Sequence, residues 1–175
     1  MLVIMAGLPG TGKSALARGL ASRLGAVRLD KDEIRAALFP PELIEYSREQ
    51  DDFCMQVLLQ TAEFLLRRRP NQIIIIDGRP FARGHQLKAV FDFANRAGTS
   101  WKVIECRCSE ETIRQRLERD AKAHPAANRN YALYQALRDD FEPIPEPKLV
   151  LDTERSLGNV VEDCLRYLKS DSHSR

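Results

Sequence analysis

The stretch that decides the fold is Gly7-Leu8-Pro9-Gly10-Thr11-Gly12-Lys13-Ser14, which spells G-x-x-x-x-G-K-[ST]. In this pattern the glycines let the backbone turn tightly, so that successive N–H groups come close to phosphate oxygens. The lysine reaches the β- and γ-phosphates, and the hydroxyl of the last residue ligates Mg²⁺. We therefore predict that residues from Gly7 to Ala15 bind the phosphates of a nucleoside triphosphate, with ATP and Mg²⁺ as the expected ligands.

The residues on either side of this loop have the pattern that a phosphate loop requires. Residues 2–6 are a short apolar run, as a buried parallel strand should be. After the loop Leu16, Leu20 and Leu24 recur every four residues until Gly25, which predicts an amphipathic helix with a glycine C-cap. The helix N-terminus adds its dipole to anion binding.

Short apolar runs alternate with helical patterns along the rest of the chain. Further strands are predicted at residues 26–29, 73–76, 101–106 and 148–151. Strands separated by helices pair in parallel through right-handed crossovers. The predicted fold class is α/β, a P-loop NTPase three-layer sandwich with a mainly parallel five-stranded sheet, helices on both faces and a short helical lid.

Capping residues mark where several of the helices begin. Asp30 is predicted to be an N-cap, and Ser47 opens a long helix that Pro70 stops. In this long helix Phe53, Val57, Thr61 and Phe64 are predicted to share the buried face. A later helix is predicted to carry Leu133, Leu137 and Phe141.

The composition is that of an ordinary globular protein. Of 175 residues, 43% are hydrophobic and 30% charged, and the net charge of +2 is too small to indicate nucleic-acid binding. No apolar run approaches the roughly 20 residues of a membrane span, which argues against a membrane partner. The N-terminus enters the first strand at once, which predicts no signal peptide. Four cysteines without C-x-x-C spacing predict reduced thiols and a cytoplasmic location.

The length predicts one domain over residues 1–170, followed by a frayed tail at 171–175. The lid is placed at residues 114–132.

Asp77 directly follows the apolar run at residues 73–76, as the aspartate of a Walker B strand does. Turn chemistry explains an Asp-Gly pair equally well when it is taken alone. The accompanying phosphate loop favours the metal site, with Ser14 and Asp77 as the Mg²⁺ ligands. The Gly78-Arg79 turn offers no further landmark.

The segment from Asp30 to Arg35 follows the second predicted strand, on the edge where ligands of parallel sheets bind. Asp32 lies at a helix start, where a carboxylate can accept the proton of an attacking hydroxyl. Arg35 is one turn further on and can bind a phosphate or an acidic acceptor. The residues by themselves favour a simpler alternative, a local Asp32–Arg35 ion pair.

Arginines recur at residues 114, 116 and 119, on a helix that leads into a polar stretch. An arginine near a γ-phosphate stabilises transition-state charge, and a mobile segment can bring it in late. A solvated basic face is an equally good interpretation of this helix.

Taken together, these motifs resemble the small P-loop kinases related to polynucleotide 5′-kinases and zeta toxins, an AAA-type group of ATP-binding kinases. The motifs that carry the resemblance, in chain order, are Gly7–Ser14, Asp32-Glu33-Ile34-Arg35, Asp77 with Arg83, and Arg116-Leu117-Glu118-Arg119. The resemblance continues through Phe141-Glu142-Pro143 to Leu151-Asp152-Thr153.

The resemblance implies ATP-dependent phosphoryl transfer to a hydroxyl. It makes Asp32 the general base and places Lys13 with Arg116 or Arg119 at the γ-phosphoryl as catalytic groups. Asp32, Arg35 and Arg83 then form the acceptor side.

Two kinds of acceptor remain open. A small hydroxyl-bearing metabolite would need a pocket, expected between the long helix after Ser47 and the lid, and the near-neutral charge favours it. A polynucleotide 5′-hydroxyl, at a single-stranded end, would need a basic groove. A nucleotide-switched interaction protein is the alternative from another class, and the acceptor element at Asp32 argues against it.

Overall fold

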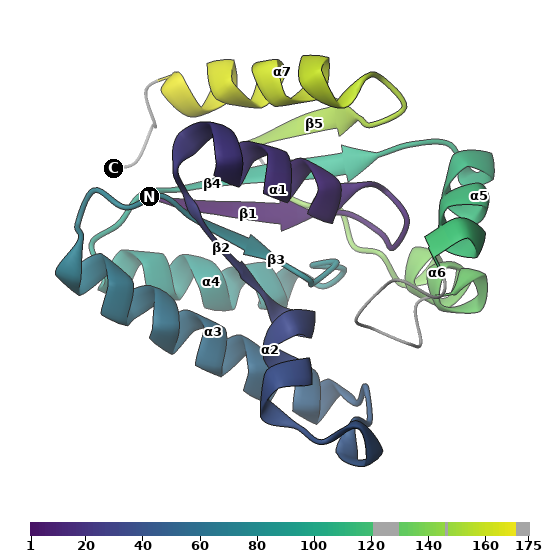
Figure 1. Cartoon of the computed structure of the whole chain (residues 1–175), viewed down its shortest axis with the longest axis horizontal. Coiled ribbons are helices and arrows are strands. Elements are labelled where there is room, and N and C mark those ends of the chain that lie inside the picture. The colour runs from purple at the N-terminus through teal and green to yellow at the C-terminus, as the bar shows by residue number, and fades with distance from the viewer. Residues whose placement is uncertain (121–129, 146, 171–175) are drawn as a thin grey trace.

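The computed structural model describes residues 1–120, 130–145 and 147–170. Its five strands form one sheet in the order β2-β3-β1-β4-β5, and every neighbouring pair is parallel (Figure 1). The strands are β1 Leu2–Ala6, β2 Val27–Asp30, β3 Ile74–Asp77, β4 Trp101–Arg107 and β5 Lys148–Asp152. The helices are α1 Lys13–Leu24, α2 Lys31–Leu38, α3 Arg48–Arg68, α4 Gly84–Arg96, α5 Glu110–Asp120, α6 Tyr131–Asp139 and α7 Leu157–Lys169, with a 3₁₀ turn at Pro41–Leu43.

The central strand β1 is buried on both faces, and its side chains divide between two cores. Leu2, Ile4 and Ala6 pack with side chains of α3 and α4. Val3 and Met5 point the other way, into a second core formed with α1 and α7. Helices therefore cover both faces of the sheet, as Figure 1 shows, and the predicted three-layer α/β fold is confirmed.

Side-chain caps fix where the helices near the site begin. The Asp30 carboxylate accepts hydrogen bonds from the backbone N–H groups of Asp32 (2.7 Å) and Glu33 (3.3 Å). The Ser47 hydroxyl accepts one from the N–H of Gln50 (3.1 Å) at the start of α3. Both predicted N-caps are therefore confirmed.

The predicted buried face of α3 is wrong. Phe53 and Phe64 are about half exposed, and the helix buries a neighbouring stripe instead. The stripe consists of Gln50, Cys54, Met55, Leu58, Ala62 and Leu66. The helix carries apolar residues on two adjacent stripes, and its contact with the sheet uses the one that contains Leu58 and Ala62. The ring of Phe53 packs edge-on against Phe39 after α2, with centroids 5.9 Å apart.

The predicted helix with Leu133 and Leu137 is α6, but Phe141 lies beyond its end at Asp139. Phe141 packs against the core that β1 forms with α3 and α4. The middle of the predicted lid, residues 121–129, and the predicted tail at 171–175 lie outside the described residues. Within the described ranges, no helix combines the length and the apolar character that crossing a membrane requires.

Candidate functional site

The phosphate loop lies between the carboxyl end of β1 and the first turn of α1. Gly7 has a φ of +127°, and a Cβ there would lie 2.4 Å from the carbonyl oxygen of Cys106 on β4, so the loop passes where no side chain fits. The Thr11 hydroxyl and the Lys13 Nζ both donate to the carbonyl oxygen of Leu8, at 2.7 and 2.8 Å. The lysine is therefore held at the loop, beside the start of α1.

Ser14 and Asp77 meet across the sheet edge, as the predicted metal site requires. The Ser14 hydroxyl donates to Oδ1 of Asp77 at 3.2 Å, and the N–H of Gly78 donates to the same oxygen at 2.8 Å. Burial and the neighbouring Asp30 carboxylate raise the pKa of Asp77, while the Gly78 N–H, Lys13 and Arg28 oppose that shift.

The two side chains suit Mg²⁺, which takes one or two protein oxygens and completes its shell with water and phosphate. Among the described residues there is no cluster of three or more His, Cys, Asp or Glu side chains that would hold a metal by themselves. Ser14 and Asp77 therefore fit a metal held together with a nucleotide rather than a site of protein ligands alone.

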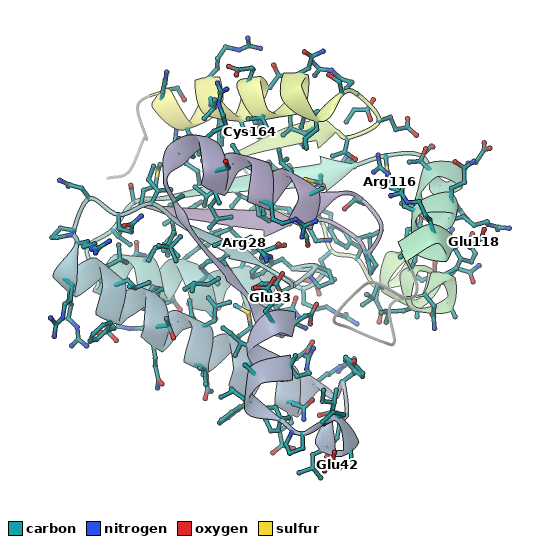
Figure 2. The ribbon with its side chains drawn as sticks, viewed as in Figure 1. Arg28, Glu33, Glu42, Arg116, Glu118 and Cys164 are labelled. Carbon is teal, nitrogen blue, oxygen red and sulfur yellow. The ribbon has the colours of Figure 1, made fainter. Side chains whose placement is uncertain are left out.

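Arg28 on β2 is a site residue that the sequence did not indicate. Its Nη1 donates to Oδ2 of Asp77 at 2.9 Å and to Oδ2 of Asp30 at 2.5 Å, and its Nη2 pairs with Glu33. Figure 2 places Arg28 and Glu33 where the end of β2 meets α2. The guanidinium compensates the charge of two buried carboxylates at the strand ends.

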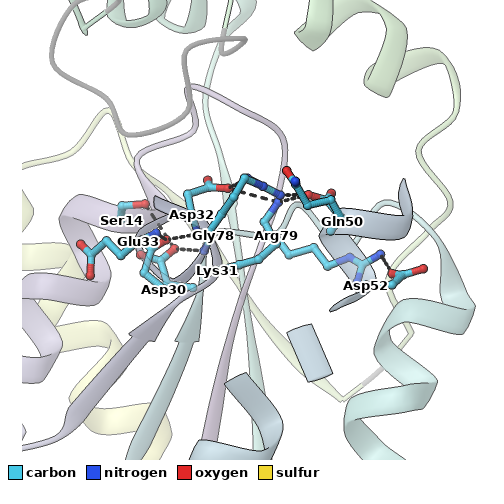
Figure 3. A network of polar contacts seen from close by, with 12 residues as sticks. Ser14, Asp30, Lys31, Asp32, Glu33, Gln50, Asp52, Gly78 and Arg79 are labelled. Carbon is cyan, nitrogen blue, oxygen red and sulfur yellow. Dashed lines mark hydrogen bonds and ion pairs between the residues drawn. The ribbon is translucent and has the colours of Figure 1, made fainter. Parts of the chain in front are cut away.

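Asp32 lies in the first turn of α2 within a network of opposite charges, part of which Figure 3 shows. Arg35 Nη1 donates to its Oδ1 at 2.6 Å, and Lys31 Nζ lies 3.2 Å from the same oxygen. Both cations also pair with Asp51 on α3. The predicted local ion pair between Asp32 and Arg35 is thus present, and it fixes the orientation of Asp32.

One cavity joins the nucleotide loop to this acidic element. It has a volume of about 500 Å³, and its wall includes Lys13 and Ser14 on one side and Asp32 and Arg35 on another. Tyr46 and the start of α3 line it, together with Leu133 and Leu137 of α6. The acceptor pocket was predicted between α3 and the lid at residues 114–132, but no described residue of that range lines the cavity.

Besides Arg35 and Arg48, two further arginines line the cavity. The predicted Arg83 is the N-cap residue of α4 and pairs with Asp140 at 2.6 Å and with Glu142 at 3.7 Å. The second is Arg79, whose turn seemed uninformative in the sequence. It is buried, and its Nη2 donates to Asp52 at 2.6 Å.

The lid arginines do not line the cavity in this structure. Arg116 donates through Nη1 to the Thr153 hydroxyl (3.0 Å) and through Nη2 to the Thr153 carbonyl (2.7 Å), and its Nη1 lies 3.5 Å from the Gly10 carbonyl oxygen. In Figure 2 it points from α5 toward the strand ends, whereas Glu118 points outward. Arg119 is exposed near the end of α5. The catalytic role of both arginines stays a prediction.

The parallel sheet, the glycine loop and the Ser14–Asp77 pair define an α/β protein of the P-loop NTPase type. The sequence profile described as an AAA domain matches residues 2–144, and the chain belongs to that family. A search of curated proteins gave no match.

Several solved structures share this fold over nearly the whole chain. A candidate kinase from Chloroflexus aurantiacus J-10-fl has a TM-score of 0.75 at 24% identity, covering 96% of this chain and 98% of its own. The Mycobacterium tuberculosis APS kinase CysC, in complex with AMPPNP and APS, has a TM-score of 0.72 at 19% identity, covering 97% of each chain. A gluconokinase from Sinorhizobium meliloti 1021 has a TM-score of 0.64 at 16% identity, covering 97% of each chain. At these identities the likeness shows the fold.

Proposed function

We propose that this protein is a phosphotransferase that moves the γ-phosphoryl group of ATP to a hydroxyl of a small metabolite. The observation that carries the proposal is the shared cavity, whose wall contains both the phosphate-loop residues Lys13 and Ser14 and the carboxylate of Asp32. A donor loop and an acidic acceptor element that face one shared cavity are what direct phosphoryl transfer needs.

In the proposed reaction the acceptor oxygen forms a bond to the γ-phosphorus, and the bond from this phosphorus to the β,γ-bridging oxygen breaks to release ADP. The hydroxyl proton passes to the carboxylate of Asp32 and from there to water. Lys13 stabilises the charge on the transferred group. Because the transition state is loose, orientation of the hydroxyl and stabilisation of charge contribute more than proton removal.

The surroundings of Asp32 suit this role. Lys31 and Arg35 lie within 3.2 and 2.6 Å of its Oδ1, so the carboxylate is oriented and its negative charge is balanced. Arg35 is buried and also pairs with Asp51, which anchors the first turn of α2 to α3. The carboxylate therefore has little freedom to turn away from an acceptor in the cavity.

Ser14 and Asp77 would hold Mg²⁺ together with the nucleotide phosphates. The ion, when bound, neutralises charge that develops on the phosphate oxygens. Arg116 and Arg119 remain candidates for late contacts to the phosphates from the lid, and Arg116 would have to leave Thr153 to make them.

The nature of the cavity supports a small acceptor over a polynucleotide end. Its volume of about 500 Å³ is that of a small-molecule site, and carboxylates such as Asp51 and Glu142 line it together with the cations. A nucleic-acid site would instead present a continuous basic groove. The APS kinase and the gluconokinase with the same fold are named for small molecules, which agrees with this choice.

The proposal is tested by ADP formation from ATP and Mg²⁺ in the presence of two kinds of acceptor. One is a panel of sugars, polyols and hydroxy acids, and the other is a single-stranded oligonucleotide with a 5′-hydroxyl. We expect a member of the small-molecule panel to stimulate ADP formation. Stimulation by the oligonucleotide alone, lost steeply as salt is added, would show the acceptor to be a polynucleotide.

A further inference from the structure

The charges on the cavity wall are arranged by depth. The side chains of Lys31, Arg35 and Arg79 are only 6%, 2% and 9% exposed. The carboxylates that pair with them on α3 are more accessible, since Asp51 is 28% exposed and Asp52 is 58% exposed. In each of these pairs the cation therefore lies deeper than its carboxylate partner on α3, while the Asp32 carboxylate, at 12% exposed, is also deep.

Of these pairs, Arg79 and Asp52 differ most in the exposure of their two side chains. Arg79 Nη2 donates to Asp52 Oδ1 at 2.6 Å, while the buried Nε of Arg79 has no hydrogen-bond partner within the described part of the chain. An exposed carboxylate returns to water at little cost, whereas a buried guanidinium needs an anion beside it. Asp52 is therefore a partner that a ligand anion can replace.

Arg35 also has a buried Nε without a hydrogen-bond partner among the described residues, but its two terminal nitrogens are held differently. Its Nη1 binds Asp32, its Nη2 binds Asp51, and its guanidinium lies 5.1 Å from the centre of the Tyr46 ring. Both terminal nitrogens are thus committed to the acidic element that the proposed reaction uses. Arg79 approaches the same cavity from the turn after β3, and in Figure 3 it points away from the Asp32 cluster toward Asp52.

We propose that the acceptor carries an oxyanion, a carboxylate or a phosphate, in addition to its hydroxyl, and that Arg79 binds this oxyanion in place of Asp52. This inference rests on the proposed function, because it describes the acceptor side of the same cavity. The guanidinium presents several N–H donors in a planar fork that matches either kind of oxyanion. The hydroxyl of the bound acceptor would then lie toward Asp32, on the side of the phosphate loop.

The test measures oxyanion binding when the phosphate loop is already filled. The protein is saturated with AMP-PNP and Mg²⁺, and inorganic phosphate and acetate are titrated separately by calorimetry. We expect one of the two probes to bind, and the tighter one identifies the kind of oxyanion. Arg79→Gln should weaken this binding at least tenfold, because a charge-assisted hydrogen bond is lost. Asp52→Asn should tighten it about two- to fivefold, because the competing carboxylate is removed.

Lys88→Gln serves as the matched control, because Lys88 is an exposed cation that pairs with Asp92 on α4. Its oxyanion affinity should equal that of the wild type. Oxyanion binding that is absent from the wild type, unchanged in Arg79→Gln, or not tightened in Asp52→Asn overturns the inference. Asp52→Asn keeps the test decisive if Arg79→Gln fails to fold. Failure of the wild type to bind AMP-PNP would instead contradict the proposed function itself.

Discussion

The Ser14 hydroxyl donates a hydrogen bond of 3.2 Å to Oδ1 of Asp77, a residue 63 positions further along the chain. This contact joins the phosphate loop to the end of β3 and brings together the two side-chain oxygens of the proposed metal site. Asp77 is fully buried, so the geometry of its carboxylate is set by the surrounding strands and by Gly78 and Arg28. The pair fits an ion that is bound together with the nucleotide.

Ser14→Ala should remove most of the advantage that Mg²⁺ gives to nucleotide binding. We expect the wild type to bind AMP-PNP more tightly with Mg²⁺ than without it. In the variant this Mg²⁺-dependent gain in affinity should be about ten- to a hundredfold smaller. Calorimetric titrations with and without Mg²⁺ measure the effect without any turnover. Equal Mg²⁺ dependence in the two proteins would show that Ser14 is not a metal ligand.

Asp32→Asn should leave AMP-PNP binding nearly unchanged and lower turnover by about 10²-fold or more, because the group that orients the hydroxyl and accepts its proton is lost. Asp51→Asn is a matched control, since Asp51 pairs with the same two cations, Lys31 and Arg35. Its turnover should fall by less than tenfold, because only support for the network is lost. Steady-state kinetics compare the variants, and equal losses in both would mean that Asp32 acts only through the ion-pair network.

Gly78→Ala should destabilise the fold much more than Gly98→Ala. Both glycines have a positive φ, but a Cβ on Gly78 would lie 2.6 Å from Oδ1 of Asp30 and 2.7 Å from the backbone nitrogen of Lys31. A Cβ on Gly98 would meet no atom within 4 Å. We expect a loss of about 1 kcal/mol at Gly98 from backbone strain, and about 3 kcal/mol at Gly78, where the clash adds to that strain. Urea denaturation measures both losses, and similar midpoints would mean that the turn after β3 relaxes around the new methyl group.

Only Cys108 should react readily with a thiol reagent at pH 8 in the folded protein. Cys54, Cys106 and Cys164 are buried, and Cys108 is partly exposed beside the phosphate loop. Burial raises the pKa of Cys106 and of Cys164 to about 12, so their thiolates form only when the pH approaches that value. Burial also raises the pKa of Cys108, so its labelling should accelerate as the pH rises. Mass spectrometry of peptides after brief iodoacetamide treatment identifies the labelled residue, and early labelling of Cys106 would contradict the packing described above.

Local sequence features predicted much of this architecture. The phosphate loop, the apolar strands and the N-caps Asp30 and Ser47 depend on residues close together in the chain, and periodicity and capping chemistry identify them. The alternation of strands and helices then implied that Asp32 and Asp77 lie on one edge of the sheet. The acceptor pocket was predicted between α3 and the lid at residues 114–132, whereas the described lining of the cavity comes from α3 and α6.

The features that the sequence did not reveal depend on contacts between distant segments. Arg28 meets Asp77 across 49 residues, and Arg79 meets Asp52 across 27. No local pattern predicts such pairs, because an arginine considered by itself is expected to lie on the surface. The buried face of α3 was mistaken for a similar reason. Two apolar stripes lie side by side on that helix, and only packing against the sheet decides between Phe53 and its neighbours.

The most direct test of phosphotransfer is to incubate the protein with ATP, Mg²⁺ and an extract of small metabolites, and to follow all products by mass. We predict a compound that gains one phosphoryl group in step with ADP formation, and no such compound with Lys13→Ala, which lacks the charge at the γ-phosphate. Free phosphate without any phosphorylated product would contradict the assignment and indicate a nucleotide-hydrolysing switch instead.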